Sequence, residues 1–380
     1  MTVSSTTDAV DFAIHGIVTV RLVDPSPRTI AAFSRRWGPA IEESPDLEPD
    51  IVIRSEPNLG PGTLDYIGLN FAGTSGSDFY VLDRVSGKPV VRIPFEDVGD
   101  RCELIAGRDW SSLPLLTDII NYRFLAKGFI PLHASAVSYR GVGVLGMGWP
   151  KGGKTGAMLA FLNHGAAFIG DEWILLSDDG DTALALPLPI GISEWQFDQV
   201  PNLVPSIDIQ KRSVFRTIHL LESLHGTLER SRFSKSAPAK LLRKGLPGLR
   251  SQLTVTKSRN ALVGVEIGEL QTSVNSVFLL IAHSAPEILV ERKEPVDVAR
   301  RMVNATMYEQ REFFGYYRAF KFGLPGRSNQ TLENADDQLL SRLQHALAGK
   351  RTHVVSHPYG GPLEDLFQAV EPYCSPPTSG

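Results

Sequence analysis

Short runs rich in β-branched and aromatic residues dominate the first hundred positions of the chain. Such runs, bounded by polar and glycine-containing turns, are typical of β-strands, and they cover residues 17–22, 51–53, 79–82 and 89–93. The last two runs flank a turn at 86–88, so we expect them to pair as a hairpin. The pattern predicts a mainly β accessory domain over residues 1–107.

Helical and strand-like patterns alternate in the rest of the chain. Apolar residues recur at helical spacing over residues 113–127, 155–164, 296–312 and 335–348. Strand-like runs lie between them at 134–139, 142–145, 166–169, 173–176, 182–186, 276–282 and 288–290. The alternation predicts an α/β domain over 108–350, followed by a C-terminal extension and tail at 351–380.

One glycine-rich motif stands between a predicted strand and a predicted helix. Residues 148–155 read G-W-P-K-G-G-K-T and meet the phosphate-loop pattern G-x-x-x-x-G-K-[ST] in full. In this pattern backbone N–H groups face a phosphate, the lysine reaches the β- and γ-phosphates, and the threonine hydroxyl ligates Mg²⁺. A glycine-rich turn without a ligand is the alternative, but the strand and helix around the loop favour nucleotide binding. The predicted nucleotide-binding residues are Gly148, Lys151, Gly152, Gly153, Lys154, Thr155 and Gly156.

An acidic pair, Asp171 and Glu172, follows a predicted strand seventeen residues after Lys154. Ligands bind beyond strand ends in open α/β sheets, so we expect this pair beside the loop. One carboxylate would accept a proton from an attacking hydroxyl while its neighbour holds Mg²⁺. An exposed strand-end turn is the alternative, because acids favour such turns. His133 precedes the hairpin that leads into the loop, and on its own it is more typical of a structural histidine.

Composition sets limits on the class of protein. The charges nearly balance, with 38 Lys and Arg against 42 Asp and Glu and a net charge of −4. The two cysteines, Cys102 and Cys374, are too few for a disulfide framework and lack metal-ligand spacing. No run of eighteen apolar residues occurs, and the first residues lack the pattern of a secretory signal. We therefore predict a cytoplasmic protein without a membrane span.

Positive charge is concentrated in residues 211–259. This segment holds twelve lysines and arginines against two glutamates, a local charge of +10, so the rest of the chain carries −14. A solvated insertion would explain such a run, and so would attraction of an acidic peptide, a phosphorylated partner or nucleic acid. Its aromatic residues of note, Phe215 and Phe233, are too few for a base-stacking platform. Nucleic acid is therefore the least favoured of these partners.

Together these motifs resemble a known family. The run 132–137, the strand 141–145, the phosphate loop and the later Gly170-Asp171-Glu172 are similar to the catalytic domain of HPr kinase/phosphorylase. They are closest to the broader HPr-kinase-related group, and the resemblance covers residues 131–177 well. It implies a P-loop domain related to phosphoenolpyruvate carboxykinase, in which ATP and Mg²⁺ drive phosphorylation of a serine hydroxyl.

The resemblance also implies roles for single residues. Lys154 and the loop glycines would bind the phosphates, Thr155 and Glu172 would bind Mg²⁺, and Asp171 would act as general base. His133 matches a histidine in the family's active-site neighbourhood. Two positions depart from the family pattern, because Glu172 replaces an aspartate and Gly156 stands where HPr kinases carry glutamate.

The resulting prediction is an ATP-dependent kinase that phosphorylates a serine or threonine on a peptide or small protein. Its fold class would be α/β, with an HPr-kinase-like P-loop domain and the N-terminal accessory domain. A homo-oligomer is compatible with the family. Two alternatives are kept: a nucleotide-binding regulatory protein without transferase activity, and a kinase of the same fold that acts on a small molecule or RNA.

Overall fold

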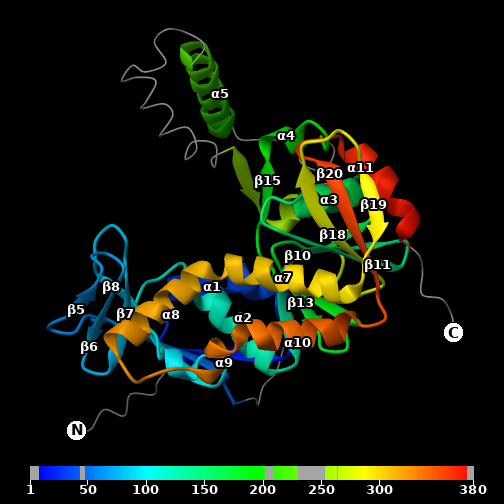
Figure 1. Ribbon diagram of the computed structural model, residues 1–380. Helices are drawn as coiled ribbons and strands as arrows, with labels where there is room; N and C mark the ends of the chain where they lie inside the picture. Colours follow the sequence, from blue (N-terminus) through cyan, green and yellow to red (C-terminus); the bar gives the residue numbers. More distant parts are fainter. Residues whose placement is uncertain (1–7, 43–47, 202–208, 230–252, 263, 375–380) are drawn as a thin grey trace.

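The computed structural model describes residues 8–42, 48–201, 209–229, 253–262 and 264–374. Two mixed β-sheets of nine strands each organise these residues, and helices pack around them (Figure 1). A two-stranded sheet, β15 (Ile190–Ser193) with β16 (Thr254–Lys257), lies beside the second sheet. The protein is therefore a mixed α/β protein, as the sequence predicts at the level of fold class.

The first sheet has the order β3-β1-β2-β4-β9-β8-β7-β6-β5. Its strands are β1 (Ala9–Ile14), β2 (Val18–Val23), β3 (Ile41–Glu42), β4 (Ile51–Glu56), β5 (Asp65–Ile67), β6 (Ala72–Ser75), β7 (Asp78–Leu82), β8 (Pro89–Arg92) and β9 (Cys102–Gly107). The predicted hairpin is confirmed, because β7 and β8 pair antiparallel. Helix α1 (Pro27–Trp37) is not predicted, although Ser26 caps it and Pro27 opens it.

The second sheet has the order β17-β14-β13-β10-β11-β18-β20-β19, with β12 also paired to β10. A hairpin of β10 and β11 crosses its centre, and β11, β18 and β20 run parallel. Arg140 and Gly141, both with positive φ, form the hairpin turn. The strands are β10 (Phe129–Tyr139), β11 (Val142–Gly148), β12 (Ala167–Gly170), β13 (Trp173–Ser177), β14 (Thr182–Ala185), β17 (Gln271–Ser273), β18 (Ser276–His283), β19 (Leu289–Arg292) and β20 (Arg351–Pro358).

Helices cover both faces of the second sheet (Figure 1). Alternation along β18 explains why: Val277 and Leu279 join one hydrophobic cluster, while Phe278 and Leu280 join another. The first cluster includes residues of α2 (Leu116–Ala126), α7 (Pro295–Glu309), α8 (Arg311–Gly323) and α10 (Ala335–Leu347). The second includes residues of α3 (Lys154–Asn163), α4 (Glu194–Phe197), α5 (Ile209–Glu229) and α11 (Leu363–Val370). Helix α9 (Gln330–Glu333) is a single turn before α10.

The two sheets share hydrophobic contacts. The first sheet ends at Gly107, where a domain boundary is predicted, but the first hydrophobic cluster continues past it. It joins Leu104 of β9 to Ile119 of α2 and Leu132 of β10. The N-terminal region is therefore packed onto the second sheet through a common core.

The C-terminal part of the predicted organisation needs correction. Residues 351–358 are not an extension, since they form β20, which pairs with both β18 and β19 inside the second sheet. Helix α11 packs on α3 through Phe161 and Phe367, whose ring centroids lie 5.2 Å apart. Because β20 has to pair with strands on both sides, the end of the chain lies in the second sheet. Helix α11, which follows β20, therefore packs next to the phosphate loop.

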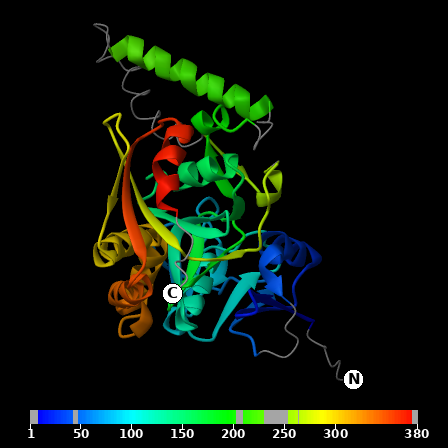
Figure 2. The same ribbon diagram turned by 90° about the vertical axis from the view of Figure 1, so that its right-hand side faces the viewer.

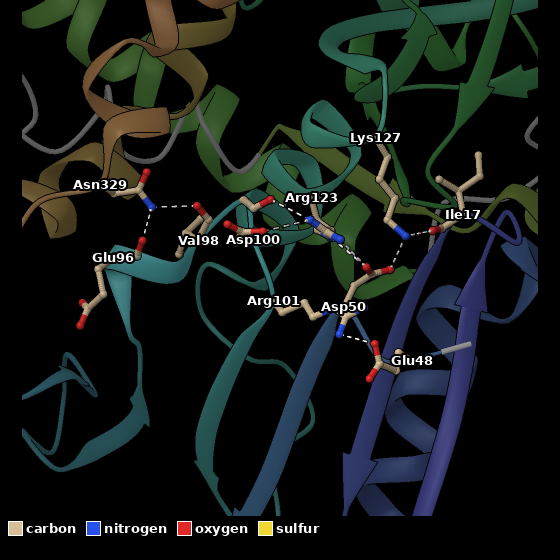
Figure 3. A network of polar contacts seen from close by, with 11 residues as sticks. Ile17, Glu48, Asp50, Glu96, Val98, Asp100, Arg101, Arg123, Lys127 and Asn329 are labelled. Atoms are coloured by element: carbon tan, nitrogen blue, oxygen red, sulfur yellow. Dashed lines mark hydrogen bonds and ion pairs between the residues drawn. The ribbon is translucent and has the colours of Figure 1, made fainter. Parts of the chain in front are cut away.

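A buried ionic network ties the first sheet to α2 (Figure 3). Asp50, only 3% exposed, accepts hydrogen bonds from Thr19 N at 2.9 Å and Arg123 Nη2 at 2.7 Å. Oδ2 of Asp50, the oxygen that accepts from Thr19, also pairs with Nζ of Lys127 at 2.7 Å, and Lys127 also donates to the carbonyl of Ile17. Burial by itself would raise the pKa of Asp50, but these bonds outweigh it and hold the pKa below its ordinary value.

The basic segment is described only in part. Residues 209–229 form α5, which lies at the opposite end of the molecule from the first sheet (Figures 1 and 2). Residues 253–262 include β16, whereas residues 230–252, with most of the predicted positive charge, lie outside the described residues. Within the described part of the chain, no helix combines the length and apolar character required to cross a membrane.

Candidate functional site

The predicted phosphate loop connects β11 directly to α3. Gly148 adopts a φ of +154°, and a Cβ there would lie 2.6 Å from the carbonyl oxygen of Leu280. Gly153 adopts a φ of +108°, in the region that side chains disfavour. Gly148 is therefore required for the close approach of the loop to β18, and Gly153 for its backbone conformation beside His357 of β20. The structure places all the predicted nucleotide-binding residues, from Gly148 to Gly156, in this loop and the first turn of α3.

Lys154 lies at the centre of the loop. Its Nζ donates to the carbonyl oxygens of Gly148 at 3.0 Å and Trp149 at 3.1 Å, and only 6% of the residue is exposed. Burial lowers the pKa of Lys154, while the nearby carboxylates oppose this shift. No side chain caps the N-terminus of α3 at Gly153. The first turn therefore combines free helix N–H groups with an ammonium group, the arrangement that binds phosphate.

Asp171 lies against the hydroxyl of the loop threonine. It is 2% exposed and accepts a hydrogen bond from Oγ1 of Thr155 at 2.9 Å. Burial raises the pKa of Asp171 to about 6, and the charge of Glu172 adds to the rise, whereas Thr155 and Lys154 oppose it. A carboxylate with a pKa near neutrality can both accept and release a proton under physiological conditions.

Glu172 and His133 form the neighbouring contact. Glu172 has a φ of 75°, and its Oε2 accepts a hydrogen bond from Nε2 of His133 at 3.0 Å. Burial alone would raise the pKa of Glu172, but the bond and charge of His133, together with Lys154, lower it overall. The expected proximity of His133 to the acidic pair is therefore observed, and the side chain has a specific partner.

Glu309 is a member of this cluster that sequence analysis missed. It is the last residue of α7, and its Oε1 lies 3.3 Å from Nδ1 of His133, outside hydrogen-bond geometry. His133 therefore stands between two carboxylates, those of Glu172 and Glu309. Nothing in the sequence near residue 309 signals this contact, because α7 reaches the loop only through the packing of the second sheet.

His357, at the end of β20, was also missed. Its Nε2 lies 2.9 Å from the carbonyl oxygen of Gly152, so this nitrogen donates the hydrogen bond. In a planar trans peptide the C=O and the next N–H point in opposite directions. The bond therefore turns the N–H of Gly153 away from His357. The signal that could have located His357 is the strand-like sequence of residues 351–358, which lies in the predicted C-terminal extension.

Trp149 and Pro150 distinguish this loop from a simple glycine-rich one. The indole of Trp149, 49% exposed, packs on Tyr308 of α7 with ring centroids 4.6 Å apart. The guanidinium of Arg311 covers the ring of Tyr308 at 4.2 Å. These contacts attach the tip of the loop to the end of α7, the same segment that carries Glu309.

A cavity of about 760 Å³ connects these groups. Its volume lies within the range of small-molecule and cofactor sites. The acidic pair and His133 line it, together with Glu309 and His357. Of the predicted loop residues, Lys151, Gly153, Lys154, Thr155 and Gly156 line it, whereas Gly148 and Gly152 do not. A second cavity of about 540 Å³ adjoins Trp149–Gly152, the end of β18 and the middle of α7.

The oxygen donors of the site suit Mg²⁺. This ion keeps several waters and binds through one or two carboxylates plus substrate phosphates. Thr155 and Glu172 supply a hydroxyl and a carboxylate to the cavity, and both residues were predicted as metal ligands. Within the described ranges, no group of three or more His, Cys, Asp or Glu side chains is arranged to hold a metal ion. The residues present thus fit an ion that is held jointly with a nucleotide.

Comparison with known proteins gives no assignment. A scan against protein-family models finds no match for this chain, and a search of curated proteins finds none either.

Proposed function

We propose that this protein is an ATP-dependent kinase with an HPr-kinase-like P-loop domain, which transfers the γ-phosphate to a serine or threonine hydroxyl. The observation that carries the proposal is the hydrogen bond from Thr155 to Asp171. It joins the metal-binding hydroxyl of a phosphate loop to a buried carboxylate whose pKa is raised to about 6. A base positioned next to the γ-phosphate assists the attack of a hydroxyl in phosphoryl transfer.

The chain's own residues have separate roles in this proposal. The loop N–H groups and Lys154 hold the phosphates of ATP and stabilise the charge on the transferring group. The oxygen of the acceptor hydroxyl forms a bond to the γ-phosphorus, and Asp171 accepts the proton of this hydroxyl. The bond between the γ-phosphorus and the β,γ-bridging oxygen breaks, and ADP leaves. Thr155 and Glu172 would hold Mg²⁺, which would neutralise negative charge on the phosphates.

The acceptor is proposed to be a peptide or small protein. This proposal rests on the family resemblance and on the size of the cavity, which leaves room beside the loop for an approaching hydroxyl. A cytoplasmic location is proposed from the cysteine-poor composition. The part of the basic segment that lies outside the described residues adds nothing to the choice of acceptor.

Substitution of the proposed base tests the activity. We expect Asp171→Asn to keep Mg·ATP binding and to lower phosphoryl transfer by about a thousandfold, the usual range for a general base. Transfer of labelled γ-phosphate to a degenerate serine/threonine peptide mixture would be measured, with Asp65→Asn on β5 as control. Equal transfer by wild type and Asp171→Asn would exclude Asp171 as the base.

One observation favours the alternative of a nucleotide-binding regulatory protein. The ammonium of Lys154 is already held by two loop carbonyls, and Trp149 fixes the loop tip on Tyr308. Such a loop would bind ATP without turning it over. This alternative predicts saturable Mg·ATP binding with no acceptor-dependent turnover in either wild type or Asp171→Asn.

A further inference from the structure

The cavity over the phosphate loop has two chemically different ends. The sheet order β10-β11-β18-β20 places His133, on β10, and Tyr359, just after β20, on opposite sides of the loop that follows β11. Three strand spacings separate β10 from β20, about 14 Å. His133, Asp171 and Glu172 line the cavity on the β10 side, whereas Trp195, Tyr359 and Pro362 line it on the β20 side, together with Glu194 and Glu222.

This polarity matches the polarity of a nucleoside triphosphate. In a phosphate loop the backbone cradles the α- and β-phosphates, and the lysine reaches the β- and γ-phosphates. If Asp171 faces the γ-phosphate, the nucleoside must leave the loop toward the opposite end of the cavity. Resting on the proposed function, we infer that the aromatic end, formed by Trp195 and Tyr359, binds the nucleobase of ATP.

The two aromatic side chains are suited to this role. Tyr359 is 61% exposed although it lines the cavity, so its ring is available for stacking. Trp195 supports it from α4, with ring centroids 6.3 Å apart and an interplanar angle of 55°. The Nε1 atom of Trp195 is buried and has no hydrogen-bond partner among the described residues. This donor is covered by protein atoms, so Trp195 contributes its ring to the cavity rather than a hydrogen bond.

Gly156 lets the first turn of α3 pack closely against α4 and α11. A Cβ at this position would lie 3.4 Å from Nε2 of Gln196 and 3.4 Å from Cδ2 of Leu363, both of which line the cavity. A longer side chain, such as the glutamate of HPr kinases, would have to displace these two residues or extend into the cavity.

Comparison of ATP with inorganic tripolyphosphate tests the inference. Calorimetry would measure both ligands, each with Mg²⁺, on the full chain as wild type, Tyr359→Ala and Trp195→Phe. Because stacking on an aromatic side chain stabilises a bound base, we expect Tyr359→Ala to weaken ATP binding about tenfold. Trp195→Phe, which keeps an aromatic ring but reduces the surface that supports Tyr359, should weaken it about threefold. Tripolyphosphate affinity should stay within twofold in both variants.

The matched control is Tyr66→Ala, because Tyr66 is 57% exposed but lies in the first sheet; its ATP affinity should equal that of wild type. If tripolyphosphate and ATP bind wild type equally, or Tyr359→Ala binds ATP as wild type does, the base site is wrong while the phosphate loop stands. An unchanged ATP affinity with weaker peptide phosphorylation would assign the aromatic end to the acceptor and overturn the inference. Absence of binding by both ligands would instead refute the proposed function.

Discussion

Two buried aspartates in this protein show opposite behaviour. Asp50 and Asp171 are 3% and 2% exposed, so burial alone would raise the pKa of both. Asp50 is surrounded by Arg123, Lys127 and the N–H of Thr19, and its pKa is lowered. Asp171 has Glu172 as its neighbour, and its pKa rises to about 6. Neighbouring charges, rather than depth, therefore separate a carboxylate that stabilises the fold from one that can exchange a proton.

The largest expected change in stability follows from removing the charge of Asp50. Asp50→Asn leaves Arg123 and Lys127 partly buried without their counter-charge, so the free energy of unfolding should fall by about 3 kcal/mol. Urea denaturation at pH 7.5 measures this loss, with Asp65→Asn as the exposed control. A lowered carboxyl pKa stabilises the fold above the unfolded pKa, about 3.9, and this contribution disappears as pH falls through the folded value. A loss below 1 kcal/mol would contradict the importance of the network.

Asp171→Asn should act in the opposite direction. Because the folded pKa of Asp171 is about 6 and the unfolded value about 3.9, the folded state binds the proton more tightly. The ionised carboxylate therefore costs stability above pH 6, on the order of 2 kcal/mol. We expect the variant to be more stable than wild type by this amount at pH 7.5 and equal to it near pH 4. Urea denaturation without Mg²⁺ checks both points, and a variant destabilised at pH 7.5 would show that the bond from Thr155 dominates.

The comparison also shows how far sequence reasoning reaches. The phosphate loop, Asp171, Glu172 and His133 were predictable because they lie within one short stretch with a contiguous signature. Glu309 and His357 were not, since each is more than a hundred residues from the loop and carries no motif of its own. Only the position of α7 and β20 in the second sheet brings them to the cavity.

The same distinction between local and long-range contacts explains which parts of the fold could be predicted. Strand-like patterns predicted seven of the nine strands of the second sheet, but only β2, β4, β7 and β8 of the nine in the first sheet. The hairpin into the loop followed from its turn residues. The shared hydrophobic core was not predictable, because the same apolar strand face can pack on a helix or on a second sheet. Asp50 illustrates the limit, since a lone aspartate before a strand gives no indication that Arg123 and Lys127 will surround it.

His357 allows loop geometry to be separated from carboxylate chemistry. His357→Ala removes the hydrogen bond that fixes the Gly152 carbonyl, so Mg·ADP should bind about tenfold more weakly, equivalent to ~1.4 kcal/mol. The affinity for AMP, which lacks the β-phosphate, should change little in this variant. Calorimetry measures both ligands, and His353→Ala is the control because His353 is buried on the same strand and stacks on Phe278. Equal losses for AMP and Mg·ADP would indicate general damage to the site.

The smallest effect is expected at Glu309, where the contrast with Asp50 is sharpest. Each cation beside Asp50 is tightly bonded, whereas Glu309 meets His133 at 3.3 Å with 25% of its side chain exposed. Partly exposed pairs contribute about 0.2–1 kcal/mol, so Glu309→Gln should lower kcat about threefold and leave the KM for ATP unchanged. Glu312→Gln, at an exposed carboxylate paired with Arg84, is the control. A loss of a hundredfold would mean that Glu309 acts on the substrate itself, and the role of Asp171 as sole proton acceptor would then be wrong.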